Sequence, residues 1–126
     1  GVAELVVTFR EKPIKPEEKK DVFYKFNALV HAHFKQNWAI KEYAFNLNST
    51  PNHLNKRIKK ETGKTASEII KAVTILEAKV LIHQTNLTLK EISTNLGFED
   101  ASYFSRFFKK ETTYSPTQYK KMIDLS

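Results

Sequence analysis

Apolar residues recur at three- and four-residue intervals along most of the chain, which is the spacing of amphipathic helices. Ser, Thr, Asn or Asp precedes several of these runs at a position suited to an N-cap, and a glycine follows two of them. We therefore expect an all-α fold of about seven helices. The expected helices cover residues 17–35, 39–47, 51–62, 66–84, 88–96, 101–112 and 116–123.

The first 16 residues have a different character. Leu5–Phe9 are mostly β-branched or aromatic, as in a strand, and Pro13 and Pro16 interrupt the chain before the first helix. We expect residues 1–16 to be an extended tail or the remnant of an upstream domain, and residues 17–126 to form one domain. The chain begins without Met, so we also expect it to be a fragment of a longer protein.

An internal repeat divides the chain. The segment KKET at 59–62 recurs at 109–112, a shift of 50 positions, and KE at 41–42 recurs at 90–91, a shift of 49. The slip of one position falls in the turn between two short helices, where insertions are tolerated. The repeat predicts two helix-turn-helix units, at about 38–63 and 88–112, joined by the linker helix 66–84 and followed by a final helix at 116–123.

The second helix of each unit has one face rich in Asn, Ser, Lys and Arg. At about 100° per residue, this face lies opposite the apolar side chains. A merely solvated face would carry more carboxylates, and these side-chain types contact base edges and phosphates. We interpret both faces as DNA-reading surfaces. They consist of Asn52, Asn55, Lys56 and Lys59 in the first unit and of Ser102, Ser105, Arg106 and Lys109 in the second.

The linker helix is suited to tandem binding. It is roughly 28 Å long at 1.5 Å per residue, and one turn of DNA is about 34 Å. Two units joined in this way can occupy successive segments of major groove. We expect a single apolar stripe along this helix, formed by Ile69, Ile70, Val73, Leu76, Val80 and Leu81.

Four segments of the second half resemble the AraC/XylS family of bacterial transcription regulators. They are LEAKVL at 76–81, ISTNLGF at 92–98, SYFSRFFKK at 102–110 and SPTQY at 115–119, and the resemblance extends over about residues 38–121. It implies binding of an asymmetric DNA site by a single chain and activation through contact with RNA polymerase. It also implies that an N-terminal sensor and dimerisation domain accompanies many members.

The resemblance and the residue chemistry together define a set of candidate contacts. Arg106 is the best candidate for a bidentate guanine contact. Asn86 and Thr88 open a helix whose N–H groups can meet a phosphate, and the lysines supply salt-dependent affinity. The expected DNA-binding residues are Thr50, Asn52, Asn55, Lys56, Lys59, Ala101, Ser102, Tyr103, Arg106 and Lys109. The expected phosphate contacts are Lys60, Asn86, Thr88 and Lys110.

Three positions depart from the family pattern. Thr74 stands where the linker helix often has Arg, and Ala66 stands where the first unit often has Pro. Thr113 stands where a Gly usually follows the second DNA-reading helix. These departures predict a different local geometry at the linker helix and a different backbone at the last turn.

Other functions are disfavoured by composition. Without Cys there is no disulfide or thiolate metal site, and the four His do not form a metal-binding motif. We therefore expect no metal, no cofactor and no enzymatic activity. No apolar run approaches the ~20 residues that span a bilayer, so we expect a cytoplasmic protein without membrane contact.

The net charge of +7 fits double-stranded DNA as the partner. We expect this fragment to be monomeric. For the full-length protein the sequence is compatible with a dimer, formed through a sensor domain that is not part of this sequence. An alternative is a protein-interaction module in which one unit no longer reads DNA, because Ala101 and Ser102 make the leading edge of the second unit weakly polar.

Overall fold

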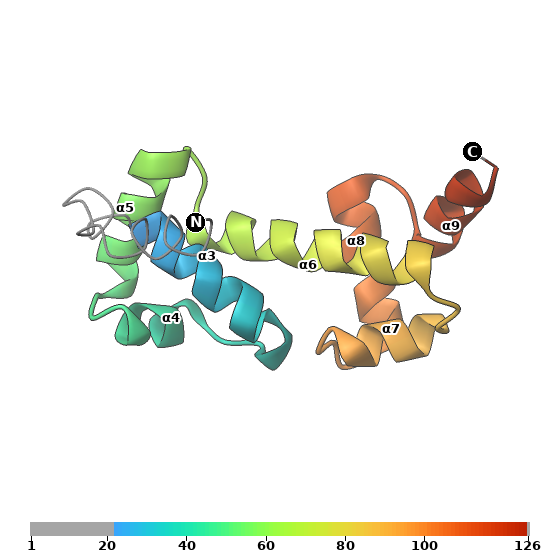
Figure 1. The fold of residues 1–126 in the computed structure, drawn as a ribbon, viewed down its shortest axis with the longest axis horizontal. Helices are drawn as coiled ribbons and strands as arrows, with labels where there is room; N and C mark the ends of the chain where they lie inside the picture. The colour runs from blue at the N-terminus through green and yellow to red at the C-terminus, as the bar shows by residue number, and fades with distance from the viewer. Residues whose placement is uncertain (1–21, 126) are drawn as a thin grey trace, which may run out of the picture.

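The computed structural model describes residues 22–125, and every regular element in that range is helical (Figure 1). The all-α prediction is confirmed, with seven α-helices and one short 3₁₀-helix between residues 22 and 125. The strand expected at 5–9 and the start of the first helix lie outside the described residues. The elements are α3 (Val22–His33), η1 (Phe34–Gln36), α4 (Ile40–Asn46), α5 (Pro51–Thr62), α6 (Ala66–Gln84), α7 (Leu89–Asn95), α8 (Ala101–Thr112) and α9 (Pro116–Asp124).

Side-chain caps determine where these helices begin. The Thr50 hydroxyl accepts from the His53 N–H at 3.2 Å, and the Asp100 carboxylate accepts from the Tyr103 N–H at 2.7 Å. At the start of α7, the Thr88 hydroxyl accepts from the Glu91 N–H at 3.1 Å while the Glu91 carboxylate accepts from the Thr88 N–H at 2.9 Å. Thr and Asp side chains therefore cap these helices, as the sequence pattern predicts, and each cap contributes about 1 kcal/mol.

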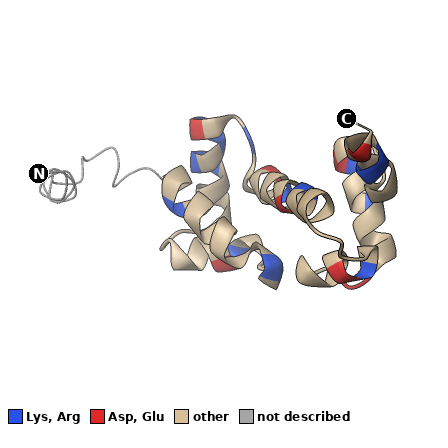
Figure 2. Ribbon diagram, turned by 45° about the vertical axis from the view of Figure 1, so that its right-hand side comes forward, with Lys and Arg blue, Asp and Glu red and all other residues tan. Residues whose placement is uncertain are grey.

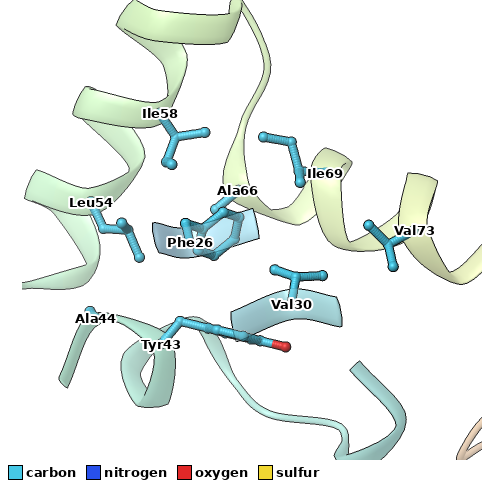
Figure 3. Close-up of a cluster of buried hydrophobic side chains, with 9 residues drawn as sticks. All are labelled: Phe26, Val30, Tyr43, Ala44, Leu54, Ile58, Ala66, Ile69 and Val73. Atoms are coloured by element: carbon cyan, nitrogen blue, oxygen red, sulfur yellow. The ribbon is translucent and has the colours of Figure 1, made fainter. Parts of the chain in front are cut away.

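The first unit is built around α3, α4, α5 and the beginning of α6. Figure 3 shows its buried side chains converging from these four helices. The Phe26 ring meets the Tyr43 ring edge-on, with centroids 5.3 Å apart. The buried residues of this core are Phe26, Val30, Tyr43, Ala44, Leu54, Ile58, Ala66, Ile69 and Val73.

The second unit repeats this arrangement with α7, α8 and the later part of α6, and α9 packs beside them (Figure 1). The Phe108 ring meets the Tyr119 ring of α9 edge-on at 5.5 Å. The Lys120 ammonium donates to the carbonyl of Ile82 at 3.0 Å, near the negative end of the α6 dipole. The buried residues are Ile75, Ala78, Ile82, Ile92, Leu96, Phe104 and Phe108.

The linker helix presents two faces rather than one. Ile69 and Val73 belong to the first core, whereas Ile75, Ala78 and Ile82 belong to the second. At ~100° per residue these two sets lie on roughly opposite sides of α6. The prediction of a single apolar stripe is therefore wrong. Leu76 and Val80 extend the first face beyond the first unit, and they are 60% and 37% exposed.

The segment between α3 and α4 also touches the second unit. The Asn37 side-chain amide donates to the carbonyl of Gly97 at 2.6 Å, and Phe34 packs against both cores. Gly97 has a φ of +86°, and a Cβ at this position would overlap the carbonyl oxygen of Lys35. The two units are thus held by α6 and by a direct contact at the turn that precedes α8.

The turn after α8 keeps the geometry of its counterpart after α5. Gly63 has φ 77° and ψ 0°, and Thr113 has φ 72° and ψ −6°. Both N–H groups donate to a lysine carbonyl at 2.8 Å, Gly63 to Lys59 and Thr113 to Lys109. The predicted difference in backbone at Thr113 is therefore wrong. A β-branched residue occupies the left-handed region there, at a cost of roughly 1–2 kcal/mol.

Candidate nucleic-acid interface

The helices α5 and α8 are presented in the same way in the two units. Figure 1 shows them running in the same general direction, each steeply inclined to α6. Each buries its apolar side in its own core, through Leu54 and Ile58 in α5 and through Phe104 and Phe108 in α8. The opposite sides of both helices therefore face away from the body of the protein, and lysines and arginines occur on both units (Figure 2).

The outer side of α5 borders a shallow hollow of about 820 Å³. The residues expected from the sequence to bind DNA in the first unit all line it, and Lys60 joins them. His53 and Thr65 also line the hollow, although the sequence did not single them out. His53 could have been predicted from the sequence, because it is an exposed residue in the first turn of α5. Thr65 could not, because it lines the hollow only where α6 folds back beside α5. The lining residues are Thr50, Asn52, His53, Asn55, Lys56, Lys59, Lys60 and Thr65.

Asn55 differs from the other residues of this hollow because it also supports the fold. Its side-chain oxygen accepts from the Ala66 N–H at 3.0 Å. Ala66 is the first residue of α6 and is fully buried, so its N–H needs an acceptor within the protein. Asn55 is half-buried, whereas Asn52 and Lys56 are exposed.

The outer side of α8 is organised by aromatic rings. The Arg106 guanidinium lies 5.9 Å from the centre of the Tyr103 ring, and the Tyr103 ring lies 5.9 Å from that of Phe98. Contacts of this kind contribute about 0.5–1 kcal/mol at an exposed site. They restrict the directions in which the Arg106 side chain extends. Ser102, Arg106, Lys109 and Lys110 are exposed, and Ala101 is half-buried.

Two acidic side chains near these surfaces serve structural roles. The Glu61 carboxylate accepts from the Phe23 N–H of α3 at 2.9 Å and pairs with Arg57 at 3.7 Å. The Asp100 carboxylate caps α8, as described above. These contacts explain why carboxylates occur at the ends of two helices whose outer sides are otherwise free of them.

The start of α7 is less suited to a phosphate than the sequence suggests. The Thr88 hydroxyl and the Glu91 carboxylate already cap each other's N–H groups. Hydrogen bonds from the backbone and the hydroxyl of Thr88 hold the pKa of the exposed Glu91 carboxyl below its ordinary value, so a negative charge stands there. Asn86 is exposed and lines a separate groove of about 370 Å³ that also contains Lys120 and Lys121.

Other kinds of site find little support in the described residues. Between residues 22 and 125, no three His, Asp or Glu side chains are grouped as metal ligands would be. In the same range no helix is both long and apolar enough to cross a membrane.

Comparison with known proteins points to one family. A family model described as a helix-turn-helix domain matches residues 43–122. Over 109 residues the chain is 26% identical to the HTH-type transcriptional activator RhaR of Escherichia coli O1:K1 / APEC. The aligned residues cover 86% of this chain and 39% of RhaR. The chain thus spans about two fifths of the length of the curated relatives it matches.

Solved structures share the fold. The C-terminal domain of AraT, a response regulator from Geobacillus stearothermophilus, matches with a TM-score of 0.76 and 26% identity over 88% of both chains. The DNA-binding domain of AdpA, a global transcriptional factor solved in complex with a target DNA, matches with a TM-score of 0.67 over 79% of this chain and 93% of that one. At 16% identity the second likeness shows the fold alone.

Proposed function

The chain is an AraC-type member of the helix-turn-helix domain family, and from this premise we propose that it reads a specific DNA sequence with both of its units at once. This part of the protein is a DNA-binding domain and not an enzyme. The relatives it matches are named as transcriptional activators, and we propose the same role for the longer protein.

One observation carries the proposal of tandem reading. The outer sides of α5 and α8 both lie away from the cores, and the units are joined by a continuous helix and by the contact of Asn37 with Gly97. A rigid connection lets both helices enter the major groove without the entropy cost of ordering a flexible linker. We therefore assign base reading to the two outer sides.

Individual roles follow from side-chain chemistry. We assign Arg106 to a guanine, because a guanidinium donates to O6 and N7 together. We assign Asn52, Lys56, Ser102 and Tyr103 to base edges or to nearby phosphates. Lys59, Lys60, Lys109 and Lys110 stand in the last turns of α5 and α8, and we assign them to phosphates. Asn86 and Thr88 remain proposed phosphate contacts, with Asn86 the stronger of the two because Thr88 is occupied by its cap.

Selection of bound duplexes from a random DNA pool, followed by footprinting, tests this proposal. Two engaged units should protect about two turns of DNA, and a single unit about half of that. A one-turn footprint would instead favour the alternative in which one unit contacts a protein. The half-buried Ala101 at the leading edge of α8 makes the second unit the one to examine for that role.

Substitution of Arg106 tests its individual role. Arg106→Ala should weaken binding to the selected site by roughly 10- to 100-fold and remove the preference for guanine at one position. Lys25→Ala is the matched control because it also removes one positive side chain. Lys25 lies on α3, which packs against the buried side of α5, so it is not on either proposed DNA-reading surface. Unchanged affinity and unchanged base preference in Arg106→Ala would exclude the assigned contact.

We further propose that the longer protein contacts RNA polymerase, as the AraC-type resemblance implies, and acts in the cytoplasm. Transcription from a promoter carrying the selected site should rise on addition of the full-length protein. We propose that this fragment is monomeric in solution, which light scattering coupled to size-exclusion chromatography will test.

A further inference from the structure

The hydrogen-bonding capacity of Asn55 is divided between the fold and the DNA-facing surface. Its Oδ1 accepts from the Ala66 N–H at 3.0 Å. A backbone N–H can only donate, so the amide must turn its oxygen toward Ala66 and its amino group the other way. Within residues 22–125 the Asn55 amino group has no hydrogen-bond acceptor, and the side chain lines the hollow beside α5.

The equivalent corner of the second unit lacks the donor. Fifty positions after Ala66 stands Pro116, which has no N–H, and fifty positions after Asn55 stands Ser105. The backbone is otherwise the same, because Thr65 has φ −77° and ψ 161° while Ser115 has φ −68° and ψ 159°. The Asn55 oxygen is therefore engaged because the residue at this position of the first unit is not proline and keeps its N–H.

This division limits what Asn55 can read. To pair with adenine through two hydrogen bonds, asparagine must donate to N7 and accept from the N6 amino group. The oxygen keeps a second lone pair, but it is turned toward Ala66, so the amide presents its amino group to the surface. Donors in that place suit the O6 and N7 of guanine or the O4 of thymine. The amino groups of adenine and cytosine would face another donor.

Given the proposed DNA-binding function, on which this conclusion rests, we infer that Asn55 selects a base with a major-groove carbonyl, guanine or thymine, and that Ala66 is the positioning residue that sets this preference. The backbone N–H of residue 66 touches no DNA in this scheme. It acts by holding the amide of Asn55 in one orientation.

Ala66→Pro tests the inference because it removes the N–H and leaves Asn55 in place. Proline is favoured at the first position of a helix, and the extended backbone of Thr65 is compatible with a following proline. The freed amide can then turn and accept from adenine. Ala66→Gly is the matched control, since it alters the same side chain but keeps the N–H.

The wild-type chain, Asn55→Ala and the two Ala66 variants are each used to select duplexes from one random DNA pool, and thermal unfolding verifies that each is folded. Asn55→Ala should remove the preference at one position of the first half-site. At that position the wild type and Ala66→Gly should favour guanine or thymine by about tenfold, and Ala66→Pro should favour adenine.

Three results would overturn the inference while leaving the proposed function intact. They are a carbonyl preference that persists in Ala66→Pro, an adenine preference that also arises in Ala66→Gly, and an Asn55→Ala variant that selects the wild-type sequence throughout. If the wild type selects no sequence at all, the proposed function fails together with the inference.

Discussion

The two helix-turn-helix units share a backbone but distribute their core volume differently. In the first unit the buried ring contributed by the motif itself, Tyr43, comes from its first helix, and α5 contributes Leu54 and Ile58. In the second unit the motif's first helix contributes Ile92 at the matching position, and both rings come from α8. The two units therefore place buried aromatic rings on different helices of the motif while keeping the same backbone arrangement.

The two units also solve the same backbone problems with different residues. The left-handed turn after the second helix holds Gly63 in one unit and Thr113 in the other. The first residue of the following helix also differs. In the first unit it is Ala66, whose N–H donates to Asn55, and in the second unit it is Pro116, which has no N–H. The first unit therefore draws Asn55 into the fold, whereas Ser105 at the matching position of the second unit meets no N–H from Pro116.

The largest effect is expected at the turn where the units meet. Gly97→Ala should lower the free energy of unfolding by about 3 kcal/mol, because a Cβ there combines a positive φ with overlap against Lys35. Gly63→Ala is the matched control. It shares the positive φ but has no atom within 4 Å of the added carbon, so it should cost only about 1 kcal/mol. Urea unfolding measures both, and equal losses would show that the contact between the units does not restrict Gly97.

Removing the hydroxyl of Tyr43 should stabilise the first unit. This buried hydroxyl has no hydrogen-bond partner within the described residues. In Figure 3 it points away from Leu54 and Ala44. Tyr43→Phe should therefore raise the free energy of unfolding by about 1–2 kcal/mol. A loss of stability in urea unfolding would instead reveal a bond that the hydroxyl makes with water.

The same substitution should change the response to alkaline pH. Burial, and secondarily the charge of Glu42, raises the pKa of Tyr43 in the folded protein. The unfolded chain then loses this proton first, so the wild type should lose stability as the pH rises above about 10. The part of that loss due to Tyr43 should disappear in Tyr43→Phe.

The first helices of the two motifs differ in their caps, and exchanging them should shift stability by a smaller amount. α7 begins after Thr88, whereas α4 begins after Ala39, whose side chain has no oxygen. Thr88→Ala should lower the free energy of unfolding by about 1 kcal/mol near neutral pH. Ala39→Thr should raise it by a part of that amount, because it gives α4 a capping hydroxyl.

Thr88→Ala should also raise the pKa of Glu91 part of the way toward its ordinary value. It removes the hydrogen bond of the hydroxyl and keeps the larger cause, the bond from the backbone N–H of residue 88. A carboxyl with a lowered pKa stabilises the folded state above its unfolded pKa, and this stabilisation is lost as the pH falls through the folded pKa. The stability difference between wild type and variant should therefore narrow in acid, which NMR titration and urea unfolding at several pH values will measure. A constant difference would indicate that the Thr88 hydroxyl does not stabilise the charged Glu91 carboxylate.

The smallest effect is expected at Thr113. Thr113→Gly should stabilise the protein by about 0.5 kcal/mol, since relief of the left-handed strain slightly exceeds the added entropy of the unfolded chain. Gly63→Thr should have the opposite sign in the first unit. Thermal unfolding of both variants tests the pair, and destabilisation by Thr113→Gly would mean that the Thr113 side chain makes a contact worth more than the strain.

The sequence by itself determined the local architecture. The sequence predicts the linker helix at 66–84, and α6 covers Ala66–Gln84. It also predicts N-caps of Ser, Thr, Asn or Asp before several helices, which the structure places at Thr50, Thr88 and Asp100. These features depend on interactions between residues within one or two helical turns of each other, so neighbouring positions in the sequence are enough to predict them. The repeat identified the two units for the same reason.

Only the tertiary structure decided how those pieces use their side chains. The two opposite faces of α6, the contact of Asn37 with Gly97 and the bond from Ala66 to Asn55 join residues that are distant in sequence. Thr113 adopts a glycine-like backbone because packing of α8 and α9 around it outweighs a strain of roughly 1–2 kcal/mol. Local pattern cannot weigh such terms, because each depends on which helix lies opposite.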